Sequence, residues 1–285
     1  MIKYPLEWGK RTYVMGIINV TPDSFSGDGI LQADDVIDRA VRQAIEFEKA
    51  GVDILDIGGE STRPGSKPIS VQEELDRILP VIESIRPKTD LFLSVDTYKA
   101  RVAEVAISSG ANWINDVWGL RADAEMPGVA ARANCPVVLM HNRSKPNEVQ
   151  LLEKLGGMYL GAVYTDLLED VKNELKQSVD LALQAGVLQQ NIIVDPGIGF
   201  GKTVQHNLDL INQLDEIKSM GYPVLLGPSR KSFIGVILDS PTDQRLEGTL
   251  AAVSVGITRG ADIIRVHDAS EAVKVARMTD ALVRR

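Results

Sequence analysis

Eight short apolar runs, each followed by a stretch with helical spacing, limit this chain to few architectures. The runs cover residues 13–19, 53–58, 91–95, 113–115, 137–141, 191–195, 223–227 and 262–267. Both faces of these runs are apolar, which is typical of strands buried in a parallel sheet. Helices are expected at residues 33–50, 71–85, 99–109, 123–133, 165–185, 204–220, 246–259 and 270–284. Eight strand–helix units in 285 residues favour a closed (β/α)8 TIM barrel over an open, doubly wound sheet.

The sequence shows no linker or low-complexity tract, so we expect a single domain over residues 1–285. Residues 1–11 precede the first core strand and are expected to form a short N-terminal extension, either an edge hairpin or a cap. Residues 142–164 contain Gly156 and Gly157 and have no clean period. We expect a long loop there, with room for a short helix at most.

Charge and composition exclude several classes of protein. The net charge is −8 and there is no basic block, so no nucleic-acid partner is expected. No apolar run approaches about 18 residues and the N-terminus lacks the apolar core of a signal peptide, so no membrane partner is expected. The single cysteine, Cys135, excludes an intrachain disulfide framework and is expected to be a buried, inert thiol. These features predict a soluble, cytoplasmic protein.

Polar or glycine-rich sequence follows every predicted strand. In a TIM barrel, the loops after the strands gather on one face and carry the site. A lone Asp after a strand is usually a helix N-cap, and Asp96, Asp116 and Asp268 each fit that interpretation. Eight such strand ends in register are hard to explain by capping alone, so we expect a ligand site on this face.

The most distinctive strand end lies in residues 192–203, where a β-branched run leads into Asp195, Pro196 and three alternating glycines. Glycines there permit a tight turn or the close approach of a ligand. The stretch is not a phosphate-binding loop, because that motif needs glycine where Pro196 stands. Taken alone, the stretch leaves a structural turn and a ligand site equally open.

The polar strand ends divide into two chemical halves. Asp96, Asn115 and Asp195 offer carboxylates and an amide, which suit a flat heterocycle with a guanidine-like edge. The loops after the last two strands are the usual phosphate site of this fold, and a helix is expected to start near Ser229. Their polar residues, which suit a diphosphate, are Ser229, Lys231, Arg265 and His267. Asn19 offers a hard oxygen that can hold Mg²⁺ together with phosphate oxygens.

The three histidines, His141, His206 and His267, form no Ser-His-Asp or Cys-His arrangement. We expect His206 to lie on the surface at a helix start, and His141 to pack or hydrogen-bond at its strand end. Zinc is not expected, because the sequence has no close cluster of His and Cys.

Seven segments, taken in order, resemble the signatures of the dihydropteroate synthase family, whose members are pterin-binding barrels. They cover nearly the whole chain and read MGIINVTPDSFS at 15–26, GESTRPG at 59–65, SVDT at 94–97, INDV at 114–117, DPGIGFGKT at 195–203, SRKSF at 229–233 and RVHD at 265–268. The resemblance implies an enzyme of folate synthesis that condenses 6-hydroxymethyl-7,8-dihydropterin diphosphate with 4-aminobenzoate. The products would be 7,8-dihydropteroate and diphosphate. It also implies Mg²⁺ as cofactor, a dissociative substitution, inhibition by sulfonamides and a homodimer formed through outer helices.

The resemblance also assigns roles to residues of this sequence. The pterin would be held by Asp96, Asn115, Asp195 and Lys231, and its slot would be walled by Met140, Phe200 and Gly227. The diphosphate would be bound by Asn19, Arg265 and His267, with Asn19 as the Mg²⁺ ligand. The aminobenzoate side would be formed by Phe25, Ser26, Asp28, Thr62, Arg63 and Ser232. The catalytic residues would be Asp96, Lys231, Arg265 and His267.

The sequence departs from the family pattern in two places. The family's first loop usually reads Ser-Phe-Ser-Asp-Gly-Gly, whereas here Gly27 precedes Asp28, so the acidic residue is displaced by one position. The loop that begins at His141 replaces the commoner His-Met-x-Gly-x-Pro and is followed by an atypical segment. These departures bear on the aminobenzoate side and on the loop after the fifth strand.

Two other functions remain open at this point. One is a pterin-dependent methyltransferase domain, which needs no diphosphate clamp and is therefore disfavoured by Lys231, Arg265 and His267. The other is a non-catalytic barrel that retains pterin binding, which the intact Asn19 and Thr62 disfavour.

Overall fold

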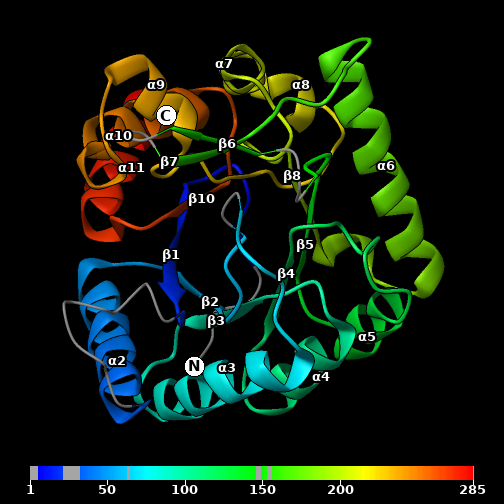
Figure 1. The fold of residues 1–285 in the computed structure, drawn as a ribbon, viewed down its shortest axis with the longest axis vertical. Coiled ribbons are helices and arrows are strands. Elements are labelled where there is room, and N and C mark those ends of the chain that lie inside the picture. Colours follow the sequence, from blue (N-terminus) through cyan, green and yellow to red (C-terminus); the bar gives the residue numbers. More distant parts are fainter. Residues whose placement is uncertain (1–5, 22–32, 63–64, 146–148, 153–155, 285) are drawn as a thin grey trace.

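A computed structural model describes residues 6–21, 33–62, 65–145, 149–152 and 156–284. A ring of helices surrounds a central set of parallel strands (Figure 1). None of the described helices is long and apolar enough to cross a lipid bilayer.

The central strands form a closed parallel barrel. Its strands are β1 (Tyr13–Asn19), β2 (Ile54–Gly58), β3 (Phe92–Asp96), β4 (Trp113–Asp116), β5 (Val137–Met140), β8 (Ile192–Asp195), β9 (Leu225–Leu226) and β10 (Ile263–Val266). Their order is β8-β5-β4-β3-β2-β1-β10-β9. A parallel bridge between Val194 and Val224 joins the two ends of this sheet. The predicted TIM barrel is therefore confirmed.

The helices largely follow the predicted stripes. Those outside the barrel are α2 (Ala33–Ala50), α3 (Val71–Ile85), α4 (Ala100–Ser108), α5 (Met126–Ala133), α6 (Leu167–Ala185), α7 (Val204–Asn212), α8 (Leu214–Lys218), α9 (Ser232–Leu238), α10 (Leu246–Thr258) and α11 (Ala269–Val283). The single helix expected over 204–220 is wrong, because Gln213 has φ −115° and ψ 32° and so separates α7 from α8. Short 3-10 helices occur at Arg86–Lys88, Gln189–Asn191 and Thr242–Gln244.

The half of the barrel interior where the strands begin is filled by apolar side chains, which we call the plug. Each barrel strand contributes a buried side chain to it: Tyr13, Ile54, Phe92, Trp113, Val138, Ile193, Leu225 and Ile263. Leu6 and Trp8 pack against this cluster from below. The described part of the N-terminal extension, residues 6–11, is thus a cap and contains no strand.

Beyond the plug, toward the ends of the strands, several residues that face the barrel interior are polar. Successive side chains of a strand point to opposite faces, so residues two apart share the barrel interior. Two positions beyond Ile54, Phe92, Trp113 and Ile263 stand Asp56, Ser94, Asn115 and Arg265. This period places polar groups at mid-height in the barrel, directly beneath the loops that follow the strands.

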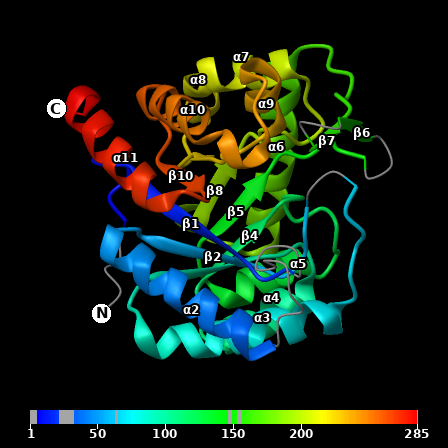
Figure 2. The same ribbon diagram turned by 60° about the vertical axis from the view of Figure 1, so that its left-hand side comes forward.

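The segment 142–164 was expected to be a loop, and this expectation is wrong. It contains an antiparallel hairpin of β6 (Val149–Leu152) and β7 (Gly156–Tyr159) that lies outside the barrel sheet. Gly156 and Gly157 sit inside β7 and pair with β6, although glycine is usually poor in strands. Figure 2 shows the hairpin across the molecule from α2.

Candidate active site

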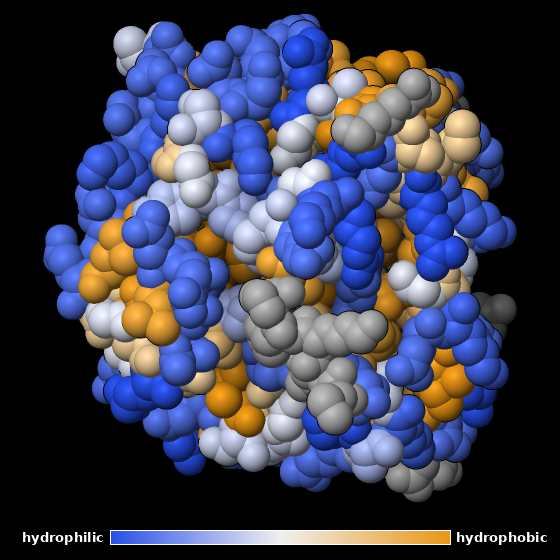
Figure 3. Space-filling model, turned by 180° about the vertical axis from the view of Figure 1, so that it is seen from behind, coloured by the Kyte–Doolittle hydropathy of each residue, from blue (hydrophilic) through white to orange (hydrophobic). Residues whose placement is uncertain are grey.

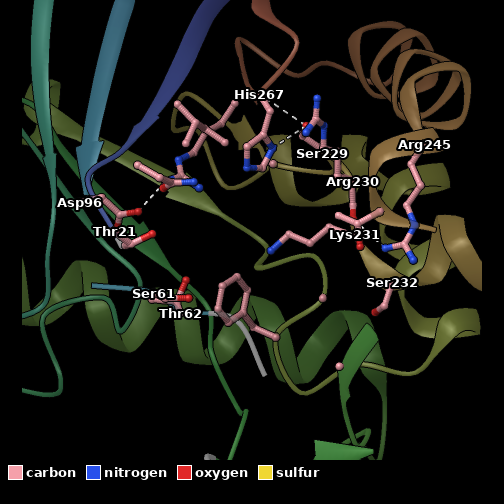
Figure 4. Close-up of a pocket in the computed structure, with 18 of the residues that line it drawn as sticks. Thr21, Ser61, Thr62, Asp96, Ser229, Arg230, Lys231, Ser232, Arg245 and His267 are labelled. Atoms are coloured by element: carbon pink, nitrogen blue, oxygen red, sulfur yellow. Dashed lines mark hydrogen bonds and ion pairs between the residues drawn. The ribbon is translucent and has the colours of Figure 1, made fainter. Parts of the chain in front are cut away.

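A cavity of about 310 Å³ opens where the strands end, and Figure 4 shows the side chains around it. The structure brings together in its lining nine residues predicted for the site: Asn19, Thr62, Asp96, Phe200, Gly227, Lys231, Ser232, Arg265 and His267. They come from the last residues of β1, β3 and β10, from the segments after β2, β8, β9 and β10, and from the start of α9. The predicted convergence of distant strand ends on one pocket is therefore confirmed, while the role of each residue stays a prediction.

Three further predicted residues lie beneath the cavity lining. Asn115, Met140 and Asp195 are 3%, 4% and 6% exposed. The Asn115 amide donates to Asp56 Oδ2 over 3.0 Å, and Met140 packs against Phe200. Four others, Phe25, Ser26, Asp28 and Arg63, lie outside the described residues.

Arg265 forms the floor of the cavity by bridging two carboxylates. Its Nε lies 2.6 Å from Asp56 Oδ2, and its Nη2 lies 2.5 Å from Asp96 Oδ2. Burial lowers the pKa of Arg265, but the two carboxylates raise it more, so the guanidinium stays charged. Burial raises the pKa of Asp96 to about 7; Arg265 opposes this shift and Asp56 reinforces it. One cation is thus shared between two carboxylates, and Asp96 binds a proton more readily than a free aspartate does.

Sequence reasoning missed Asp56, which is fully buried at the centre of this network. Its Oδ2 accepts from both Arg265 and Asn115, while its Oδ1 has no hydrogen-bond partner among the described residues. The alternation of side chains along β2 could have indicated this residue from the sequence. Asp56 is a lone carboxylate in an apolar strand, on the same face as Ile54 and Gly58.

Asp195 and Lys231 form the second charged group near the cavity. Asp195 Oδ1 accepts from the Gly197 amide over 2.7 Å, which closes the turn after β8. Burial raises the pKa of Asp195 to about 6, against the opposing effects of that amide and of Lys231. Burial also lowers the pKa of Lys231 to about 8, and Arg265 adds to this shift. The Lys231 ammonium lies 4.1 Å from the centre of the Phe200 ring, which is part of the cavity lining. That Phe200 walls a pterin slot stays a prediction.

The loops after β9 and β10 are joined by side-chain pairs. Ser229 Oγ lies 3.0 Å from His267 Nδ1 and accepts from the His267 amide over 3.1 Å (Figure 4). Arg230 pairs with Asp268 through two hydrogen bonds, and its backbone has a left-handed φ of 56°. A buried arginine, Arg245, donates to the Arg230 carbonyl over 2.9 Å and so supports this turn. These contacts fix Ser229 and His267 side by side at the cavity edge.

The helix expected to start near Ser229 begins three residues later, at Ser232, with Lys231 as its N-cap residue. The left-handed Arg230 is the reason, because a helix cannot run through that conformation. The Ser229 hydroxyl is therefore a partner of His267 and is not part of a helix terminus.

Lys202 is a second residue that sequence reasoning left without a role. It is 2% exposed, and its Nζ lies 2.9 Å from His141 Nδ1 and donates to the Phe200 carbonyl over 3.1 Å. Burial lowers the pKa of Lys202 to about 7 and that of His141 to about 4. His141 Nε2 lies 3.2 Å from Glu174 Oε2, so this chain reaches the outer helix α6. The expectation that His141 bonds at its strand end is confirmed.

The loop that carries Thr62 is supported by another buried charge cluster. Lys99 Nζ lies 2.6 Å from carboxylate oxygens of both Glu60 and Glu74. The Tyr98 hydroxyl donates to Glu60 Oε1 over 2.7 Å. Glu60 lines the cavity next to Thr62, so the cluster fixes the start of this loop.

Several residues have structural roles. Asp116 accepts from the amides of Trp118 and Leu120 and so closes the turn after β4. Its interpretation as a helix N-cap is wrong, because α5 begins only at Met126, with Glu125 as the N-cap residue. Cys135 is buried, and burial raises the pKa of its thiol to about 12, as expected for an inert thiol. His206 lies in the first turn of α7, where it forms a capping box with Thr203, but it is partly buried and not fully on the surface.

A metal would have few protein ligands at this site. Among the described residues, no group of three His, Cys, Asp or Glu side chains could hold an ion. Asn19 lines the same cavity as Arg265 and His267. A single amide oxygen suits Mg²⁺, which usually keeps waters and binds phosphate oxygens in place of a full protein cage.

The closed barrel and this pocket define a class: TIM-barrel enzymes that act on a ligand carrying both a polar ring and an anionic group. The cavity lining contains the carboxylates of Glu60 and Asp96 together with Lys231, Arg265 and His267. Such a pairing of acid and cation along one cavity fits a molecule that carries both kinds of group.

Comparison with known proteins specifies the family. The family model described as "Pterin binding enzyme" matches residues 15–267. Dihydropteroate synthase of Clostridium beijerinckii is 49% identical over 278 residues, covering 97% of this chain and 96% of that protein. The chain belongs to the pterin-binding enzyme family, and the resemblance noted in its sequence is confirmed.

Two solved structures agree with this assignment. Dihydropteroate synthase from Clostridium difficile, determined in the presence of pteroic acid, has a TM-score of 0.89 and 43% identity, covering 99% of this chain and 100% of that one. The enzyme from Xanthomonas albilineans with 4-aminobenzoic acid has a TM-score of 0.86 and 38% identity, covering 96% and 94%.

Proposed function

We propose that this chain is a transferase that condenses 6-hydroxymethyl-7,8-dihydropterin diphosphate with 4-aminobenzoate, giving 7,8-dihydropteroate and diphosphate. The observation that carries this proposal is the mixed charge of the cavity lining. A carboxylate and cationic side chains lie on one continuous lining that contains Asp96, Lys231, Arg265 and His267. A pterin ring joined to a diphosphate presents the complementary arrangement.

The pterin half rests on Asp96, Asn115, Asp195 and Lys231. The guanidine-like edge of a pterin offers paired N–H donors, and a carboxylate accepts both. Asp96 at present shares Arg265 with Asp56, so binding would place the pterin within this charge network. Met140, Phe200 and Gly227 would form the apolar walls of the slot.

The diphosphate half rests on Arg265 and His267, together with Asn19. Arg265 stays charged at any physiological pH, and Ser229 fixes the orientation of the His267 ring. When bound, Mg²⁺ held by Asn19 and the diphosphate would neutralise charge on the leaving group.

The chemistry needs a good leaving group more than a strong base. The bond between the pterin methylene carbon and the diphosphate oxygen breaks, and the electron pair leaves with the diphosphate. The amine nitrogen of 4-aminobenzoate then forms the new C–N bond and releases one proton to solvent. Arg265 and His267 stabilise the charge on the departing oxygen, which favours the dissociative path.

The aminobenzoate side rests on Thr62 and Ser232, both in the cavity lining. Phe25, Ser26, Asp28 and Arg63 are assigned to the same side by resemblance. Because sulfonamides resemble 4-aminobenzoate, we expect them to compete for this part of the cavity.

The test is the release of diphosphate when purified protein is mixed with dihydropterin diphosphate, Mg²⁺ and 4-aminobenzoate. We expect release coupled to dihydropteroate formation, and its arrest by EDTA. Arg265→Met should abolish it, whereas Arg259→Met at the C-cap of α10 should not. Pterin binding without turnover would favour the non-catalytic barrel. Methyl transfer from a methylated pterin would favour the methyltransferase.

We also propose that the chain acts as a homodimer in the cytoplasm. Support comes from exposed apolar side chains on two neighbouring outer helices: Val255 on α10, and Met278, Leu282 and Val283 on α11, which are 44%, 60%, 57% and 44% exposed. They line a shallow groove with Val275 and Thr258. The face seen in Figure 3 is mostly hydrophilic, with small separate apolar areas.

A further inference from the structure

The hairpin β6–β7, which lies in the segment after β5 and outside the barrel sheet, reaches the cavity. Gly157 and Tyr159, both on β7, are part of the cavity lining. They are two residues apart on one strand and therefore face the same side. The hairpin thus presents one face of β7 to the substrate space.

Tyr159 makes two contacts across the cavity mouth. Its hydroxyl donates to the Thr62 carbonyl over 3.1 Å. Its ring stacks on Phe200, with centroids 6.2 Å apart and an angle of 29° between the planes. The residue therefore joins the loop after β2 to the loop after β8.

The base of the hairpin is fixed at both ends. Arg143, before the hairpin, donates to the Val163 carbonyl over 2.8 Å, which ties the incoming chain to the outgoing one. The Ala162 amide donates to the Gly201 carbonyl over 2.9 Å. These bonds hold β7 against the loop that carries Phe200.

The hairpin also neighbours the other residue assigned to the aminobenzoate side. Strand β7 lies beside α9, whose first residue is Ser232. Tyr159 therefore stands between Thr62 on one side and the α9 loop on the other. Burial raises the pKa of Tyr159, so its hydroxyl stays protonated and can donate at physiological pH.

We propose that Tyr159 is a positioning residue for the arylamine substrate: it holds the Thr62 loop over the aminobenzoate end of the cavity and completes the wall begun by Phe200. The inference rests on the proposed function. The loop after β5 thereby becomes part of the second-substrate site, in addition to the loops after β1, β2 and β9.

Substitution of Tyr159 tests the hydrogen bond separately from the ring. Tyr159→Phe keeps the stacked ring and removes the bond to Thr62, together with the hydrogen bond between the Tyr159 hydroxyl and Ser144. Because a lost neutral hydrogen bond changes affinity by about two- to tenfold, we expect KM for 4-aminobenzoate to rise by this factor. KM for dihydropterin diphosphate should stay within about twofold. Tyr159→Leu, which also removes the ring, should raise KM for 4-aminobenzoate further.

Tyr164→Phe is the matched control. Its hydroxyl also donates to a loop carbonyl, that of Gly201, over 3.2 Å, but Tyr164 does not line the cavity. We expect both KM values to stay within about twofold in this variant. Tyr159→Phe behaving like Tyr164→Phe, or raising both KM values equally, would overturn the proposal.

A direct binding measurement separates this inference from the proposed function. If the wild-type protein forms no dihydropteroate, the proposed function fails. The role of Tyr159 is then decided by calorimetric titration with 4-aminobenzoate, in which Tyr159→Phe must bind more weakly than Tyr164→Phe. Absence of any wild-type binding would overturn both proposals. If turnover is normal and the variants do not differ, only the inference fails.

Discussion

At the scale of single residues, the site depends on charges that are buried but not all neutralised. Asp56, Asp96 and Arg265 form a group with two carboxylates and one guanidinium. Asp195 and Lys231 lie close by, with pKa values displaced toward neutrality by burial. Such displaced values gather at functional sites, because a site that binds a polar ligand must first remove its own groups from water.

The first prediction at this scale concerns Asp195. Asp195→Asn removes a charged acceptor beneath the pterin slot, and lost charge-assisted hydrogen bonds cost about 1.5–3 kcal/mol. We expect pterin affinity to fall by about ten- to a hundredfold in calorimetric titration. Asp180→Asn, which changes an exposed aspartate paired with Lys176 on α6, is the control. Unchanged pterin affinity in Asp195→Asn would remove this residue from the site.

The second prediction concerns the proton on Asp96. Its pKa is about 7 in the folded protein, against an ordinary value of 3.8. Between these values the folded state binds more protons than the unfolded state, so the stabilising contribution of Asp96 is lost as pH rises toward about 7. Relative to Asp96→Asn, the wild-type free energy of unfolding in urea should fall from about pH 4 to about pH 7. A relative rise would mean that Arg265 keeps Asp96 ionised.

At the scale of elements, the spacing of apolar residues explains which helix and strand bounds could be predicted from the sequence. The bounds predicted for residues 33–50 and 71–85 agree with α2 and α3. Both helices carry long apolar stripes, and Ser70 caps α3 by accepting from the Glu73 amide. The predicted ends of β1, β2 and β8 agree with the structure, and the other five strand ends are displaced by one residue. This agreement arises because a polar residue after an apolar run marks the point where a strand leaves the core.

Other features could not be predicted, for physical reasons. The hairpin has strands of only four residues, and its glycines indicate a turn unless pairing across the hairpin is known. Asp56 is one polar residue in an apolar run, and only the barrel shows that it meets Arg265. The left-handed turn at Arg230 depends on Arg245, which is distant in the sequence.

The third prediction concerns the glycine turn after β8. Gly197 has φ +71°, and an added Cβ would lie 1.8 Å from the His141 carbonyl oxygen. Gly221 has φ +87° and open space around it, so Gly221→Ala isolates the cost of the backbone conformation, about 1–2 kcal/mol. We expect Gly197→Ala to lower the free energy of unfolding by clearly more, as measured by urea titration. Equal losses would mean that the turn can move away from β5.

At the scale of the whole molecule, the barrel separates its two ends. The plug from Tyr13 to Ile263 closes one end, and the polar loops surround the other. The exposed apolar groups on α10 and α11 lie on the outer wall, toward the C-terminal ends of these helices, where Asp280 accepts from the Thr12 amide just before β1. An association through this wall would leave the cavity mouth of each copy open.

The fourth prediction tests that association. Leu282→Glu places a charge in the apolar groove between α10 and α11, and a buried unpaired charge strongly disfavours an interface. We expect a dimer for the wild-type protein and a monomer for the variant in sedimentation equilibrium. Leu188→Glu, at another exposed leucine, should remain a dimer. A monomeric wild-type protein would refute the proposed homodimer.

The apolar plug has a consequence for how this sequence can change over evolutionary time. Its side chains touch one another and the cap at Leu6 and Trp8, whereas the polar groups stand one layer higher. Selection for a stable fold therefore acts mainly on mutations in the plug, and selection for activity acts mainly on mutations in the loops. Few positions are subject to both. A lineage can adapt its thermal tolerance in the lower layer while the substrate preference set by the upper layer is inherited unchanged.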